Sequence, residues 1–282
     1  MKRLLIPIVC ILFVFTHALY SQCSDAGVCS IGSQHEQLGH SFSAGYAFGK
    51  SGKSDDLTFH SFHVEGSIRV LEDSRLSIVL PWSSASGPLG KASGIGDLTI
   101  LLNQVVWKNT ENQLSVQAGG KFATGSVNLG NLPQAYQPGL GTNDLLLGIS
   151  FHTEPWLFAL GYQLSPGRSS NAAIQLKRGD DLLARVGYKT RTDEFTFGLE
   201  VLAIKRLQEA SIVSPSAQIT SSFVSIPGSD QFQVNVLGNA AMKLSKSYSL
   251  RFLGAVPLRS RPVNVDGLTR SITLSIGLHY AI

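Results

Sequence analysis

Histidines with serines beside them are the residues of this sequence that could do chemistry. Two stretches, residues 40–43 and 60–63, place both types together. A nucleophilic serine needs a histidine within hydrogen-bonding reach and a third group that orients the histidine. Neither stretch supplies both, and strand-like alternation would point His60 toward lipid and His63 inward. We therefore expect no catalytic residues and no enzyme, and keep an outer-membrane lipid hydrolase as a minor alternative.

The first 21 residues have the composition of a secretory signal peptide. Lys2 and Arg3 precede an apolar run over residues 4–15, and small residues follow it. The run is shorter than the roughly 20 apolar residues that a membrane-spanning helix needs. We expect cleavage after Ser21. The formal net charge of +4 then falls to about +2 without a basic stripe, so no nucleic-acid partner is expected.

Two cysteines, Cys23 and Cys29, lie close together in a segment, residues 22–39, that we expect to be periplasmic. In an exported chain such a pair favours a small disulfide loop. Lipid modification of Cys23 is the alternative reading. A metal site would require more ligands than these two, so we expect no metal and no cofactor.

Period-two alternation of apolar and small polar residues runs through residues 40–282. Leu145, Leu147, Ile149 and Phe151 form one apolar stripe, and the final stripe begins at Ile272. Twelve such runs predict an all-β protein. The polar stripes are rich in serine, glutamine and asparagine and poor in charge, unlike the charged surface of a soluble protein. We therefore expect the apolar stripes to face lipid and the polar stripes to face a lumen.

Connections between the predicted strands alternate strictly in length. The short ones cover residues 72–73, 108–111, 153–155, 190–193 and 244–247, and the long ones cover residues 49–56, 83–95, 125–143, 165–180, 206–230 and 258–269. This pattern predicts a transmembrane antiparallel up-and-down β-barrel of about 12 strands, with short periplasmic turns and long extracellular loops, in the bacterial outer membrane. Weak alternation over residues 217–226 predicts an extracellular hairpin or, alternatively, a barrel of 14 strands. Outer-membrane lipids and the barrel assembly machinery are the expected partners, the latter through the closing strand that ends at Ile282.

Two glycine-rich phrases precede predicted strands. "SGIGDLTILL" (93–102) and "LPQAYQPGLGTNDLLLGISF" (132–151) both place Gly-x-Gly shortly before an aspartate. The pairing resembles a family of outer-membrane transporters related to the meta-pathway of phenol degradation. That resemblance implies that Asp97 and Asp144 face the lumen at the outer strand ends, and it implies transport of apolar or aromatic compounds. The plainer interpretation is that the glycines supply positive φ at loop-to-strand corners.

Charged residues on the polar stripes are the candidates for contact with a solute. They carry mixed charge, which favours pairing across the lumen over an ion-selective ring, although a weak preference for anions is the alternative. The candidates are Glu65, Arg69, Asp97, Lys121, Asp144, Arg185, Glu200 and Arg251. Tyr136 is a candidate in the mouth loop, to contact a solute or to fold inward as a lid.

A narrow lumen is expected, because twelve strands lie between filled eight-stranded barrels and open sixteen-stranded porins. The expected function is passive passage of small solutes, apolar or aromatic ones included, through an outer-membrane channel. The alternative is a surface structural or adhesion barrel whose outer loops bind a partner.

Overall fold

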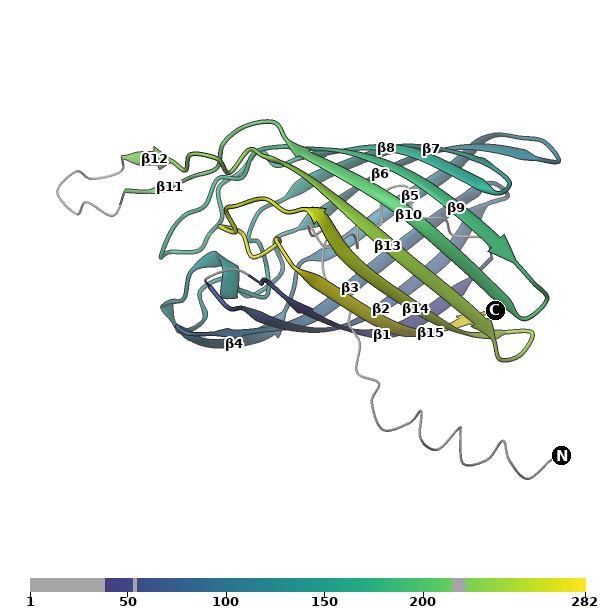
Figure 1. The fold of residues 1–282 in the computed structure, drawn as a ribbon, viewed down its shortest axis with the longest axis horizontal. Helices are drawn as coiled ribbons and strands as arrows, with labels where there is room; N and C mark the ends of the chain where they lie inside the picture. The colour runs from purple at the N-terminus through teal and green to yellow at the C-terminus, as the bar shows by residue number, and fades with distance from the viewer. Residues whose placement is uncertain (1–38, 53–54, 215–221) are drawn as a thin grey trace, which may run out of the picture.

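Twelve long strands close into one antiparallel barrel in the computed structural model, which describes residues 39–52, 55–214 and 222–282 (Figure 1). The predicted signal peptide and the Cys23–Cys29 pair lie outside these ranges. The barrel strands are β1 (Ser41–Lys50), β2 (Thr58–Leu71), β3 (Ser74–Gly87), β5 (Leu98–Lys108), β6 (Asn112–Phe122), β7 (Asp144–Thr153), β8 (Trp156–Leu164), β9 (Asp181–Arg191), β10 (Phe195–Arg206), β13 (Phe232–Lys243), β14 (Tyr248–Arg259) and β15 (Ile272–Ala281).

Closure of the barrel comes from pairing between its first and last strands. β1 pairs along its whole length with β2 on one side and with β15 on the other. Unpaired backbone N–H and C=O groups in hydrocarbon cost several kcal/mol each, so a membrane-embedded sheet has to close in this way. The prediction of a twelve-stranded antiparallel barrel is confirmed.

All short connections lie at one end of the barrel, here called the turn end, and all long ones at the other, here called the loop end (Figure 1). Short elements occur only within the long connections of the described chain: β4 (Gly90–Ile95), η1 (Leu129–Asn131), η2 (Gln134–Tyr136), β11 (Ser211–Val213) and β12 (Phe223–Ser225). β11 and β12 pair only with each other, as a hairpin that projects from the loop end. Of the stretch 217–226, the structure describes residues 222–226, and β12 there belongs to this hairpin and not to the barrel.

One predicted connection is wrong. Residues 83–95 were expected to form a loop, but β3 continues to Gly87 and β4 folds back along it as a hairpin. Gly90, with φ of 131°, makes the tight turn possible, since few other residues adopt that conformation. β3 pairs with β5 only over Ser74–Val79, so β4 occupies its edge near the loop end.

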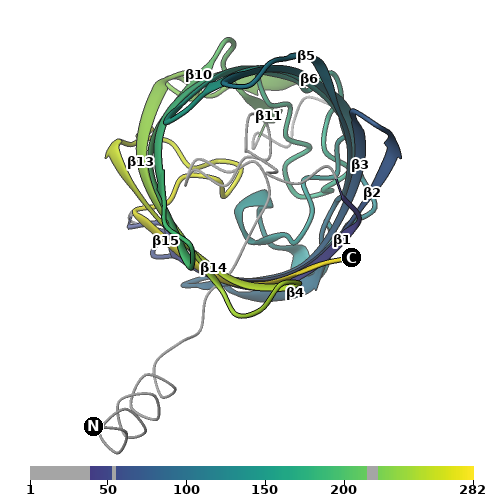
Figure 2. The ribbon, with the colours of Figure 1, turned by 90° about the vertical axis from the view of Figure 1, so that its right-hand side faces the viewer.

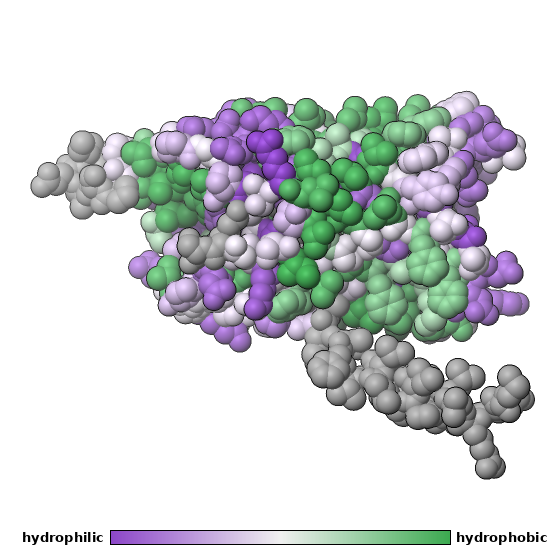
Figure 3. Space-filling view, in the orientation of Figure 1, coloured by the Kyte–Doolittle hydropathy of each residue, from purple (hydrophilic) through white to green (hydrophobic). Residues whose placement is uncertain are grey.

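The outer wall of the barrel is apolar. Figure 3 shows apolar side chains over much of the wall and polar ones toward both ends. The large exposed apolar side chains come from the predicted lipid-facing stripes: Phe62, Ile78, Val116, Leu147, Leu160, Val186, Leu199 and Leu274 are 38–59% exposed. Within the described ranges, no helix has both the length and the apolar character required to cross a membrane.

We expect the two faces of the wall to respond oppositely to charge. Leu160, which is 56% exposed, lies in the middle of β8, and Ser150 lies on the inner face of the neighbouring β7. Leu160→Arg should lower the free energy of unfolding by about 2–4 kcal/mol, because it places a cation in the hydrocarbon, while Ser150→Arg should change it little. Denaturant unfolding in lipid vesicles measures both values, and equal losses would contradict the assignment of faces.

Candidate functional site: the lumen and its mouth

The connection between β6 and β7, residues 123–143, folds inward over the loop end. Tyr136 is only 3% exposed and packs with Leu57, Phe59 and Ala85 on the inner wall. The backbone N–H of Leu89 donates a hydrogen bond to the Tyr136 hydroxyl (3.1 Å). Tyr136 thus fixes this connection to the β2–β3 wall and is not exposed at the mouth in this conformation.

Asp97 immediately precedes β5 and anchors the same connection, residues 123–143. One carboxylate oxygen accepts a hydrogen bond from the N–H of Gly125 (3.1 Å), and the other accepts one from the N–H of Leu140 (2.6 Å). A Cβ on Gly125 or on Gly139 would lie within 2.9 Å of Asp97 Oδ1, so both glycines are required by close approach to the carboxylate. The expected positive φ occurs at Gly141 (67°) but not at Gly139.

Asp144 begins β7 on the inner face, as the resemblance implied. It accepts hydrogen bonds from the Thr142 hydroxyl (3.0 Å) and from Gln163 Nε2 (2.5 Å). Lys121 is its register partner on β6 and is 1% exposed. Asp97, Lys121 and Asp144 therefore lie together at the loop end of neighbouring strands.

A second connection, residues 165–180, is bound to the first. Asn171 Nδ2 donates to the carbonyl of Val127 (2.6 Å), and Asn128 Nδ2 donates to the carbonyl of Ser170 (3.0 Å). The Ser169 hydroxyl donates to Gln134 Oε1 (2.7 Å). These side-chain contacts join two connections that are separate in the sequence.

A third connection, residues 260–271, completes the cover over the loop end. Gly267 lies against the backbone of Ala135, where a Cβ would approach within 2.7 Å of the carbonyl oxygen. Arg270 lies over the ring of Phe59, with its guanidinium carbon 4.3 Å from the ring centre. We call residues 123–143, 165–180 and 260–271 together the plug. In Figure 2, segments of these connections cross the opening of the strand ring, and a cavity of about 30 Å³ lies between the plug and the β2–β3 wall.

A buried ion cluster holds the plug to the barrel wall. Arg206, at the end of β10, bonds Asp181 on β9 (Nε to Oδ1, 3.0 Å) and Asp266 of the plug (Nη2 to Oδ2, 2.9 Å). Arg178 of the plug bonds Asp181 as well (2.9 Å), and Arg261 lies 3.8 Å from it. All five side chains are at most 7% exposed. The cluster joins two plug connections to two adjacent strands.

Charges within this cluster stabilise the ionised aspartate of the plug. Burial alone would raise the pKa of the Asp266 carboxyl, but the charges of Arg206, Arg261 and Arg178 outweigh it, so the pKa lies well below its ordinary value. Burial lowers the pKa of Arg270 to about 10, which leaves that guanidinium charged at neutral pH. Asp266 is therefore ionised at neutral pH.

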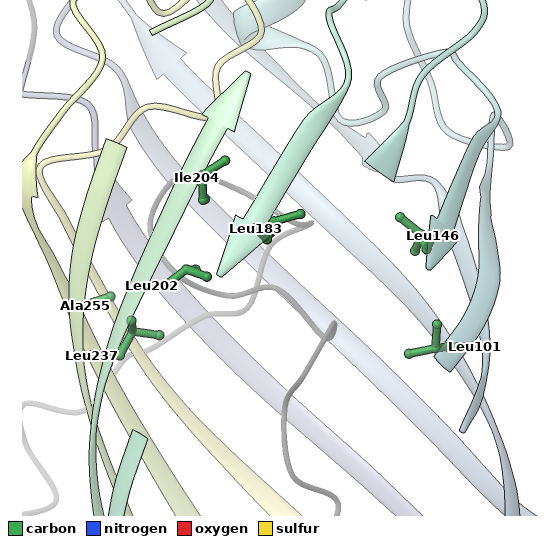
Figure 4. Packing of buried hydrophobic residues seen from close by; sticks show 7 residues of the cluster. All are labelled: Leu101, Leu146, Leu183, Leu202, Ile204, Leu237 and Ala255. Carbon is green, nitrogen blue, oxygen red and sulfur yellow. The ribbon is translucent and has the colours of Figure 1, made fainter. Parts of the chain in front are cut away.

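Apolar side chains line part of the inner wall, contrary to the expectation of a polar lumen. We call Leu101, Leu146, Leu183, Leu202, Ile204, Leu237 and Ala255 the apolar arc (Figure 4). They come from β5, β7, β9, β10, β13 and β14, and each is at most 4% exposed. Gly119 on β6 lies between Leu101 and Leu146 in the register. Leu101 occupies the space that a side chain at 119 would need, since a Cβ there would lie 3.0 Å from Leu101 Cδ1.

A polar rim follows the apolar arc toward the loop end. The rim consists of Asp97, Lys121, Asp144, Gln163, Asp181, Arg206 and Gln233, on or next to β5, β6, β7, β8, β9, β10 and β13. Asp144 on β7 is followed on the inner face by Leu146, and Asp181 on β9 by Leu183. On these two strands the inner wall thus changes from charged to apolar between one inward-facing residue and the next.

The remaining predicted site residues lie nearer the turn end. Arg185 pairs with Glu200 across β9 and β10 (3.4 Å), and Asn239 Nδ2 donates to Glu200 (3.0 Å). Glu65 accepts a hydrogen bond from Ser67 (3.2 Å), and Arg69 is exposed at the end of β2. Arg251 on β14 is the register partner of Gly277. The structure therefore separates the eight lumen candidates into a rim group and a turn-end group.

The two histidines of the stretch 60–63 lie on opposite faces of β2. His60 Nδ1 lies 3.0 Å from the Tyr46 hydroxyl and its ring packs edge-on against Phe48, on the outer face, while His63 points inward and is 7% exposed. Across the described ranges, His, Cys, Asp and Glu side chains form no group of three that could hold a metal ion.

Neither a protein-family model nor a curated protein matches this sequence. Solved structures are similar in fold. An outer-membrane channel from Pseudomonas putida F1 superposes with a TM-score of 0.66 at 13% identity, covering 90% of this chain and 98% of that one. The chain has the fold of an outer-membrane β-barrel. The NanC porin (TM-score 0.51, 9% identity, 86% and 100% covered) and the transport unit of the autotransporter AIDA-I from Escherichia coli (0.50, 12%, 92% and 95%) share it.

Removing one carboxylate from the ion cluster should release the plug. Asp266→Asn removes one of the two carboxylates that balance three buried arginines, and breaking a buried pair in this way costs about 3–5 kcal/mol. We expect trypsin to cleave after Arg178 and Arg270 of the plug much faster in this variant than in the wild type. Because the pKa of Asp266 is lowered on folding, its contribution is present above about pH 4 and is lost as the pH falls further.

Asp230→Asn is the matched control. Asp230 pairs with Lys205 at the loop end, but both side chains are 37–40% exposed. Such a pair contributes at most about 1 kcal/mol, so cleavage in the plug should stay slow. If trypsin cleaves the plug of the Asp266→Asn variant as slowly as that of the wild type, the ion cluster does not hold the plug.

Proposed function

We propose that this protein is an outer-membrane channel for passive passage of small solutes with apolar or aromatic parts. The observation that carries the proposal is the apolar arc, which places leucine side chains on the inner face of a barrel whose outer face is already apolar. A polar lumen would suffice for hydrophilic solutes. The inward leucines are at most 4% exposed in this conformation, and once the plug parts they would give a surface on which an apolar group loses contact with water.

Support for passage also comes from the fold. A twelve-stranded barrel that crosses the outer membrane encloses an interior continuous with both ends of its strands. Short turns at one end and long connections at the other, the arrangement of bacterial outer-membrane barrels, support a periplasmic turn end and a plug that faces outward. The resemblance to transporters related to phenol degradation agrees with apolar or aromatic solutes, and the predicted signal peptide agrees with export.

Substitution in the apolar arc should change which solutes pass. Phenylalanine and glutamine are zwitterions of similar size that cross lipid slowly, so their relative rates report the channel in a liposome-swelling assay. Leu202→Asn should lower the rate of phenylalanine relative to glutamine about threefold or more, because the apolar contact is lost. Val201→Thr, on the adjacent outward position, is the control and should keep the wild-type ratio. An unchanged ratio in the Leu202→Asn variant would contradict the proposed role of the arc.

Passage requires the plug to part, because its connections cover the loop end. Asn128→Cys and Ala172→Cys join two plug connections where the N–H of Ala172 donates to Asn128 Oδ1 (2.6 Å). Oxidation of this pair should lower single-channel conductance in planar bilayers, and a reductant should restore it. Each single substitution is the control. Conductance that is equal with and without the cross-link would show that these two connections do not need to separate.

A further inference from the structure

Lys121 is a buried cation at the loop end of β6. Its side chain is 1% exposed, and its Nζ makes no hydrogen bond with any residue that the structure describes. An ammonium group without hydrogen-bond acceptors is costly to bury, because it loses its hydration without replacement. Lys121 therefore has donors available for another molecule.

The two carboxylates nearest to Lys121 in the fold are already used by other donors. Asp97 accepts the backbone N–H groups of Gly125 and Leu140, and Asp144 accepts the Thr142 hydroxyl and the Gln163 amide. They oppose the charge of Lys121 without forming a hydrogen bond to it. Their bonds hold the plug and the strand ends in place around the ammonium group.

Lys121 also lies at the border of the apolar arc. On β6 the next inward position toward the turn end is Gly119, which is flanked by Leu101 of β5 and Leu146 of β7. Register places Thr99 and Asp144 on either side of Lys121. A free ammonium group is thus adjacent to an apolar wall, beneath the connection that Asp97 anchors.

We infer that Lys121 binds the oxyanion of a solute whose apolar body lies against Leu101 and Leu146. This inference rests on the proposed function and narrows the solute class to molecules with an apolar part and one carboxylate or sulfonate group. Charge-assisted hydrogen bonds from an ammonium to an oxyanion are the strong ones in a buried setting. The solute reaches Lys121 when the plug parts.

Block of the single-channel current in planar bilayers tests the inference. Benzenesulfonate is the probe, and benzyltrimethylammonium carries the same kind of apolar body with the opposite charge. Lys121→Met should raise the concentration of benzenesulfonate for half-block about tenfold or more, as expected for loss of a hydrogen bond to a charged group, and should not raise that of benzyltrimethylammonium. Lys121→Arg should retain benzenesulfonate block. Calorimetric titration of detergent-solubilised protein with benzenesulfonate should give the same order of affinities without relying on conduction.

Lys189→Met is the matched control, since Lys189 is an inward lysine near the turn end of β9. It should leave block by benzenesulfonate close to the wild-type value. Equal losses in the Lys121→Met and Lys189→Met variants would overturn the inference in favour of a general effect of positive charge. Loss of block by both probes in the Lys121→Met variant would assign Lys121 a structural role only.

Failure of the inference and failure of the proposed function are distinguishable. A wild-type channel that conducts and favours phenylalanine over glutamine, but is not blocked by benzenesulfonate, would refute the role of Lys121 alone. A correctly folded wild-type protein that does not conduct would refute the proposed function.

Discussion

Pairing of every backbone polar group within the wall is the constraint on which the rest of this structure depends. In hydrocarbon no water is available to bond an open strand edge, so β1 has to pair with β15. Once the sheet is closed, each strand has one face toward lipid and one toward the axis. The two-residue period of the sequence thereby separates a lipid surface from a lumen. The up-and-down order of the strands places successive connections alternately at the two ends of the barrel.

At the loop end, long connections fold back over the barrel, and their buried polar groups need partners within the protein. Many of their polar groups bond specific side chains. Asp97 bonds two backbone N–H groups, and the Arg206–Asp181–Asp266 group joins the plug to β9 and β10. An ion cluster of this kind is costly to break and contributes mainly by fixing one arrangement of the connections.

Much of this architecture could be predicted from the sequence. Alternating stripes and alternating connection lengths predicted the number of strands, the lipid face and both ends of the barrel. The lumen face was harder to predict, because only doubled apolar residues such as Leu101–Leu102, Leu182–Leu183 and Val236–Leu237 reveal that both faces of a strand are apolar at one level. The apolar stripes alone do not show that a strand is apolar on both faces, because each stripe contains residues of one face only.

Long-range contacts within the plug could not be predicted at all. Arg178, Asp181, Arg206, Arg261 and Asp266 come from three separate parts of the chain, and no local spacing connects these parts. For the same reason the sequence could not decide whether Tyr136 contacts a solute or folds inward, and its packing with Leu57, Phe59 and Ala85 depends on the folded connection. The aspartates of the two glycine-rich phrases were placed correctly on the inner side, but the use of Asp97 as an anchor for two backbone N–H groups depends on the folded connection.

Cysteine accessibility along β7 and β10 tests the central claim, that leucines of the apolar arc line a conducting lumen while their neighbours face lipid. Single cysteines at Leu146 and Leu202, and at the outward neighbours Leu145 and Val201, would be treated with a charged, water-soluble thiol reagent during planar-bilayer recording. Conductance is expected to change irreversibly when the cysteine is at 146 or 202 and to remain constant when it is at 145 or 201. Equal modification at inward and outward positions, or modification at 145 and 201 alone, would contradict the account.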